Sequence, residues 1–156
     1  MKKNNKIIGL IKSIYAKIFL INDTPQKIAL GLGLGVFLGI LPGVGPVAAL
    51  VLAGLFRVNR ATAVLGSLAT NTWLSLVTFI LSIKVGSAII GANWKNVYHD
   101  ALTFIKHFHS WDLFKVSVLQ VALPLAIGYL VVSFCLGLIA YLITLTILTN
   151  LKKPLR

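Results

Sequence analysis

The sequence predicts an all-α integral membrane protein, and three observations lead to that fold class. Apolar residues make up 58% of the 156-residue chain, a higher share than in most soluble domains. Only 12% of residues are charged, about half the usual proportion. Residues 28–56 and 61–82 carry no ionisable side chain, and residues 116–151 carry only tyrosine hydroxyls and one thiol. Soluble helices need charged faces over such lengths, whereas lipid favours their absence.

The length suits one domain. We predict an amphipathic interfacial helix over residues 1–22 and a single helical membrane domain over residues 23–156. Fifteen Lys and Arg against three Asp and no Glu give a net charge of +12. The cations gather at the chain ends and in short connectors, which suits the bilayer and its anionic lipid headgroups. A nucleic-acid surface needs cations interleaved with aromatics on one folded face, so we expect no nucleic-acid partner.

Residues 1–22 show the pattern of a helix on the membrane surface. Their apolar run is interrupted by Lys12 and Lys17, which speaks against a secretory signal peptide. At about 100° per residue, large apolar side chains fill one half of the helix, and the other half is mostly lysine and small or polar residues. This split predicts an interfacial helix; packing on a soluble partner is the alternative.

The first long apolar segment is broken near its middle. After a start at Pro25, residues 28–41 make a helix of about 21 Å, too short for a hydrocarbon core of about 30 Å. A Pro/Gly stretch over residues 42–46 interrupts it, residues 47–56 add about 15 Å, and residues 57–60 bring two arginines. We predict a re-entrant hairpin that enters the bilayer, turns near mid-depth and returns to the side it left.

Glycines recur along the first half of this hairpin. Gly31, Gly35, Gly39 and Gly43 are four residues apart, so they line one face of a helix, and small residues at that spacing let two backbones approach closely in lipid. We expect Gly31, Gly35 and Gly39 to pack against another helix. The returning half offers small candidate counterparts at residues 49, 53 and 54.

The second apolar segment is also broken. Residues 61–69 and 73–83 are apolar, and between them stand Thr70, Asn71 and Thr72, which favour caps and turns over helix interiors. Two consecutive broken segments are typical of transport sites. The alternative is a plain turn at residues 42–46 and a helix-to-helix hydrogen bond from Asn71.

The remainder of the chain predicts a surface segment and one spanning helix. Residues 92–115 mix aromatics, lysines and three histidines, which suits the headgroup level; His99, His107 and His109 do not complete a metal-ligand set. After Pro124, residues 125–149 make an apolar helix of about 37 Å. The single cysteine of the sequence, Cys135, lies in this helix, and we expect it to be a packing residue. The positive-inside rule then places both termini and the Arg57–Arg60 loop in the cytoplasm.

Residues already named also carry a family pattern. They are Pro25, Ile28-Ala29-x-Gly31, the glycine run ending in Leu41-Pro42-Gly43, Arg57-Val58-Asn59-Arg60 and Leu65-Gly66. On these residues the chain resembles a bacterial membrane family catalogued as domain of unknown function 2062, well over residues 24–91 and more loosely over the last helix. The family's Asn-Pro-x-Thr motif is kept here only at Asn71, because Thr72 and Leu74 take the other two places. The resemblance implies no established activity. The family's occasional joining to glycosyltransferase domains points to envelope metabolism.

We expect a carrier or translocator of an anionic small molecule or lipid headgroup in the bacterial inner membrane. In a re-entrant hairpin, the helix after Pro46 begins near mid-bilayer, and its free N–H groups carry positive partial charge. The candidate anion path consists of Arg57, Asn59, Arg60, Asn71, Thr72, Gly43, Gly45 and Pro46. A spanning segment without a carboxylate does not suit a carboxylate-based proton or sodium relay.

Two other classes are weighed against this one. A non-transporting scaffold would use the glycine face to pack on an envelope-synthesis partner, and the breaks would be only turns. A water-accessible cavity at residues 42–46 would favour transport, and a filled core would favour the scaffold. An enzyme ranks third, because no carboxylate pair or nucleophile–base spacing indicates catalysis, and no cofactor is expected. A homo-oligomer is left open.

Overall fold

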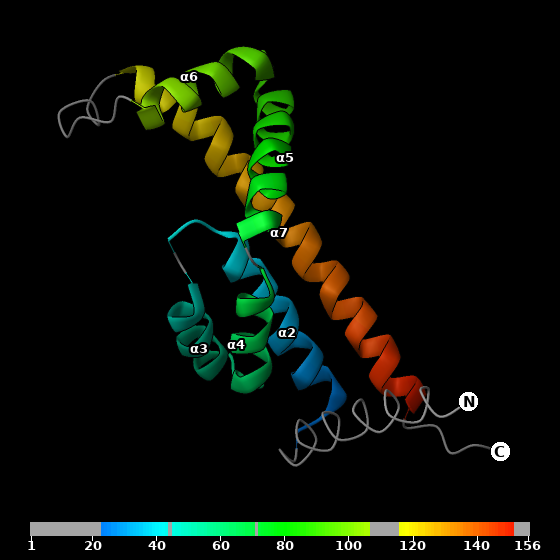
Figure 1. Ribbon diagram of the computed structural model, residues 1–156. Coiled ribbons are helices and arrows are strands. Elements are labelled where there is room, and N and C mark those ends of the chain that lie inside the picture. The colour runs from blue at the N-terminus through cyan, green and yellow to red at the C-terminus, as the bar shows by residue number, and fades with distance from the viewer. Residues whose placement is uncertain (1–22, 44, 71, 107–115, 152–156) are drawn as a thin grey trace, which may run out of the picture.

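The computed structural model describes residues 23–43, 45–70, 72–106 and 116–151, and these ranges form six helices and no strand (Figure 1). The all-α prediction is confirmed for these ranges. The interfacial helix predicted over residues 1–22 lies outside them, and so do Asn71, His107 and His109. The division of the chain at residue 22 therefore stays a prediction.

The longest helix, α7 (Val116–Leu151), is the spine of the molecule. Helix α2 (Pro25–Ile40) lies against its C-terminal half (Figure 1). The two backbones meet at Gly33 and Gly137, where a Cβ built on either glycine would lie 2.8 Å from the carbonyl oxygen of the other. Neither position has room for a side chain, so the close approach depends on glycine in both helices.

The helices α2 and α3 (Gly45–Leu55) form a hairpin that returns to the end where it began. Thr24 caps α2 by accepting a hydrogen bond from the Lys27 N–H at 3.4 Å, and Pro25 takes a first-turn position, where no helical bond is lost. The backbone N–H of Asn59, beyond α3, donates to the Lys27 carbonyl at 3.2 Å. The start of α2 and the end of α3 therefore lie side by side; we call this end the hairpin base.

The second broken segment continues through the molecule. Helix α4 (Arg60–Ala69) packs beside α2 and α3, and α5 (Thr72–Ile90) packs on the N-terminal half of α7 (Figure 1). The axes of the pair bend by 82° at the break, so the break predicted at residues 70–72 is present. The pair runs from the hairpin base toward the opposite end, unlike the hairpin.

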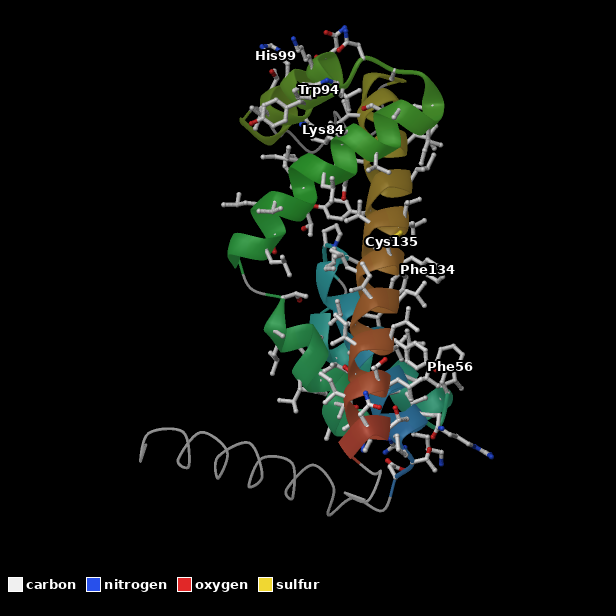
Figure 2. All side chains as sticks on the ribbon, turned by 90° about the vertical axis from the view of Figure 1, so that its right-hand side faces the viewer. Phe56, Lys84, Trp94, His99, Phe134 and Cys135 are labelled. Atoms are coloured by element: carbon white, nitrogen blue, oxygen red, sulfur yellow. The ribbon has the colours of Figure 1, made fainter. Side chains whose placement is uncertain are left out.

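Helix α6 (Trp94–Lys106) covers the far ends of α5 and α7 (Figure 1). Its Val97 and Ala101 are buried with Ile83 of α5. The Lys84 ammonium of α5 lies 5.0 Å from the centre of the Trp94 ring, a distance within the range of cation–π attraction. This end gathers polar side chains, as Lys84, Trp94 and His99 show in Figure 2.

The predicted start of the last helix after Pro124 is wrong, because α7 continues through Pro124 from Val116. A proline inside a helix removes one backbone hydrogen bond and costs about 3 kcal/mol. Here Pro124 is fully buried, and Gly86 of α5 packs directly on its carbonyl group. The neighbouring helix α5 covers the proline here, and packing of neighbouring helices is one setting in which interior prolines are tolerated.

The glycine face of α2 packs on α4 rather than on α3. Gly31 lies against Asn59 and Thr62, Gly35 against the Ala63 carbonyl, and Gly39 against Ser67 and Thr70. The expected counterparts on α3 have other neighbours: Ala49 and Ala53 are buried with Leu38 and Ala63, and Gly54 lies under Arg60. Gly43 takes no part in packing, because it belongs to the turn.

One stretch of α7, Val121–Asn150, is long and apolar enough to cross a membrane, and α4 with α5 is a second candidate if the bent pair is one span. In the 18-residue apolar window of this stretch, only 17% of the residues are buried inside the molecule, whereas a core helix of a soluble protein is mostly buried. Large apolar side chains are also exposed on α3 and α5, among them Leu55, Val51 and Val77.

Candidate functional site

Asn59 is the structural link at the hairpin base. Its side chain is only 2% exposed. Its Oδ1 accepts from the Thr62 N–H at 2.9 Å and so caps α4, and its Nδ2 donates to Asp23 Oδ2 at 2.9 Å. Both ends of the amide make hydrogen bonds within the chain, so Asn59 links the segment before α2 to the start of α4.

Arg57 occupies a left-handed position after α3 where glycine is the usual residue. Its φ is +54°, and two backbone bonds surround it: Val58 N–H to the Ala53 carbonyl at 3.0 Å, and Arg57 N–H to the Gly54 carbonyl at 3.3 Å. These are the two bonds of a Schellman C-cap, with Arg57 at the left-handed position. A left-handed conformation costs an L residue about 1–2 kcal/mol, so arginine here carries strain that glycine would not.

Cations predominate at the hairpin base. Lys27, Arg57 and Arg60 are exposed there, against the single carboxylate of Asp23. The Arg60 guanidinium lies over α3, since a Cβ on Gly54 would stand 3.2 Å from its Nε and Nη2. An excess of positive charge raises the local concentration of anions, so this end can attract an anionic group.

The hairpin tip, which the structure describes at residues 41–43, 45 and 46, lies beside a hollow. Gly43 and Gly45 have φ of +80° and +59°, and a Cβ on either would meet nothing within 4 Å. A hollow of about 460 Å³ borders them, and Ser75 of α5 and Tyr129 of α7 line its other side. We call it the tip hollow. The first N–H groups of α3 begin at its edge and have no partner within their own helix.

The second break comes close to the tip. Gly39, which borders the tip hollow, lies against Thr70, and Thr70 donates its hydroxyl to the Ser67 carbonyl at 2.7 Å. Thr72 begins α5, whose first turn carries Ser75. The two breaks therefore meet in the middle of the molecule.

The structure divides the candidate path into two groups. Arg57, Asn59 and Arg60 lie at the hairpin base, and Gly43, Gly45 and Pro46 lie at the tip, with α3 (about 16 Å long) between them. Asn71 is outside the described residues. The interior between the groups is packed by Leu38, Ala49, Ala53 and Ala63, so a ligand moving between base and tip would follow the outside of the hairpin.

Sequence reasoning missed Ser75 and Tyr129 of the tip hollow. Ser75 follows shortly after the second break, and Tyr129 is a polar aromatic within a long apolar run. Those signals existed, but their convergence depends on how α5 and α7 cross. No three His, Cys, Asp or Glu side chains come together as a metal site within the described residues.

A family model described as an uncharacterized protein conserved in bacteria, DUF2062, matches residues 9–154. No curated protein and no solved structure matches the chain. The family match extends over the hairpin, both breaks and α7. The chain therefore belongs to the bacterial family DUF2062, as the resemblance indicated.

Proposed function

We propose that this chain is a membrane-embedded carrier or translocator of an anionic small molecule or lipid headgroup. In this proposal α7 crosses the bilayer, α4 and α5 together make a second crossing, and α2 and α3 form the re-entrant hairpin. The hairpin base faces the cytoplasm, in agreement with the positive-inside rule, and the membrane is the bacterial inner membrane.

The exposed apolar surface supports the membrane location. The 18-residue apolar window of α7 is only 17% buried, and Val47, Leu55 and Phe134 are each more than half exposed. A soluble monomer rarely exposes contiguous apolar area on this scale, because such surface drives association in water. Hydrocarbon around α3, α5 and α7 removes that cost.

The tip hollow is the observation that supports transport most directly. A cavity at the turn favours a carrier, whereas a filled core favours a scaffold, and the tip hollow lies at this turn. Tyr129, on its wall, is about 20 Å from the start of α7 and about 33 Å from its end at 1.5 Å per residue. With α7 across the bilayer, the hollow lies well inside the hydrocarbon.

In this proposal, the residues at the hairpin base and those at the tip have different roles. Arg57 and Arg60 attract the anion at the cytoplasmic mouth, and the open turn at Gly43 and Gly45 gives it access to the first N–H groups of α3. Residues 28–56, 61–82 and 116–151 contain no carboxylate. Facilitated movement of the anion therefore suits the chain better than carboxylate-based coupling to protons or sodium.

Reconstitution in liposomes tests this function. The rates to measure are uptake of inorganic phosphate and flipping of a fluorescent phosphatidylglycerol, for the wild type and an Arg57→Gln/Arg60→Gln variant. We expect the variant to lower at least one rate by about tenfold, since removing two charges from a mouth lowers the local anion concentration by 10-fold or more. Lys84→Gln/Lys95→Gln, which removes two exposed cations at the opposite end, is the matched control and should change the rate much less.

A scaffold for an envelope-synthesis partner is the second candidate. The packed interior between base and tip and the exposed apolar faces favour it. If the double arginine variant inserts, folds and keeps the full rate, the anion path is wrong and the scaffold becomes the better explanation. Absence of both activities in the wild type leads to the same conclusion.

A further inference from the structure

A second hollow lies on the flank of the molecule, and none of the residues that line it belongs to the candidate path. It holds about 600 Å³ between α2, α3 and α7, a volume within the roughly 300–1,000 Å³ of small-molecule sites. Four aromatic side chains form much of its wall: Phe37, Phe56, Phe134 and Tyr141. We call it the lateral groove.

The close contact of α2 and α7 gives the lateral groove its depth. Gly33 and Gly137 both line it, and each would place a Cβ within 2.8 Å of the other's carbonyl oxygen. The floor is therefore bare backbone, while longer side chains rise on both sides. Such a slot accepts a thin, flexible apolar chain more readily than a second helix, whose diameter is about 10 Å with its side chains.

The walls of the groove remain open along its length. Phe56 and Phe134 are each 62% exposed, and Leu138 is 46% exposed. Figure 2 shows Phe56 and Phe134 on the same side of the molecule, with Phe56 nearer the hairpin base. The groove thus runs along the direction that lipid chains take beside a spanning helix.

The charge at one end of the groove identifies the kind of occupant. Phe56 lines the groove, and the next residue is Arg57, in the exposed cationic group at the hairpin base with Lys27 and Arg60. An apolar slot that ends at cations complements a molecule with an apolar chain and an anionic head. We propose that the lateral groove binds one acyl chain of an anionic phospholipid, whose phosphate lies against Arg57. This site rests on the membrane location proposed above and does not require transport.

Lipid retention by the full chain tests the site. Protein purified in mild detergent from vesicles of equal phosphatidylglycerol and phosphatidylcholine is analysed by native mass spectrometry. Leu138→Trp fills the groove; Ile139→Trp changes an equally exposed neighbour that does not line it. We expect Leu138→Trp to reduce bound phosphatidylglycerol about tenfold, as expected for displacing two methylene groups, and Ile139→Trp to leave it unchanged. Arg57→Gln should remove the preference for phosphatidylglycerol over phosphatidylcholine.

Equal retention in Leu138→Trp and wild type overturns the site, and so does an equal loss in both tryptophan variants. A Leu138→Trp protein that turns from dimer to monomer with unchanged lipid identifies a second copy as the occupant, which also overturns it. A measurement on the wild type avoids dependence on a variant that misfolds. Phosphatidylglycerol with a photoreactive acyl chain should crosslink mainly to residues of the groove. Labelling spread uniformly over α5 and α7 contradicts the proposal. Loss of phosphate uptake and flipping with lipid retention intact would remove the carrier function and leave this site standing.

Discussion

Both halves of α7 are packed against a neighbouring helix through glycine, but the polar groups near the two contacts differ in their hydrogen bonding. In the half near the hairpin base, Gly33 and Gly137 bring α2 against α7; in the other half, Gly86 brings α5 onto Pro124. The groups around these contacts differ. Thr62, buried beside the base, donates its hydroxyl to the Ile28 carbonyl of α2 at 3.0 Å, whereas the buried Ser82 hydroxyl of α5 has no hydrogen-bond partner among the described residues.

In the base half, hydrogen bonds as well as packing fix how the helices are arranged. Hydrogen bonds have directions, so the base half, tied by Asn59 and Thr62, is limited to one arrangement of α2, α3 and α4. The half around α5 is held by packing, which tolerates small shifts of one helix along another. We therefore expect the base half to unfold as a unit and the α5 half to be more adaptable.

The largest effect is expected where α2 meets α4. Gly35→Ala places a methyl group against the Ala63 carbonyl group, and moving a backbone to relieve such overpacking costs about 1–3 kcal/mol. Gly54→Ala is the matched control, because its methyl would meet only the movable Arg60 guanidinium at 3.2 Å and it gains about 0.5–1 kcal/mol of helix stability. Thermal unfolding in detergent measures both. If the two alanines behave alike, close packing on α4 does not hold the base half together.

A middle-sized effect should separate the polar groups of the two halves. Asn59→Ala removes the cap of α4 and the bond to Asp23, which we expect to cost about 1–2 kcal/mol. Ser82→Ala removes a buried hydroxyl without a partner, so its stability should change little or rise slightly. Urea unfolding with both variants checks the contrast. A larger loss for Ser82→Ala would mean that the α5 half is the more specified of the two.

The smallest effect on stability concerns the strained arginine. Arg57→Gly relieves the positive φ and should raise the free energy of unfolding by about 1 kcal/mol or less. Because the same change removes one of the two arginine charges, it should also lower the anion rate, and it should remove the phosphatidylglycerol preference as Arg57→Gln does. Unfolding and flux measured on one preparation test both expectations. A glycine variant that keeps the full anion rate and the full phosphatidylglycerol preference would show that the Arg57 side chain serves neither proposed role.

The sequence predicts elements better than it predicts partners. Breaks at residues 42–46 and 70–72 follow from local chemistry, because Pro, Gly, Thr and Asn act on their own backbone. The partner of the glycine face does not follow, since Gly35 fits any small-residue face, and α4 and α3 both offer one. The bonds from Asn59 and Thr62 to α2 favour α4 as the partner, and they form only in the folded structure.

Tertiary contact also decides the features that sequence reasoning missed. Pro124 indicates a helix boundary in the sequence, whereas in the structure α7 continues through it and α5 packs on it at Gly86. The tip hollow and the lateral groove each draw residues from α7 and from a distant helix. A periodic pattern on one helix contains no information about the space left between two, so neither hollow could be predicted from composition or spacing.

The contact of Gly33 with Gly137 has a consequence for the order in which the chain acquires its structure. Helices α2, α3 and α4 are neighbours in the sequence, so their hairpin and caps form across short loops, at low entropic cost. The partner of Gly33 is made only when α7 is synthesised, after α2 to α6. Until then the flank of α2 that becomes the groove floor lacks its opposite wall, so the nascent hairpin passes through a stage with that flank uncovered.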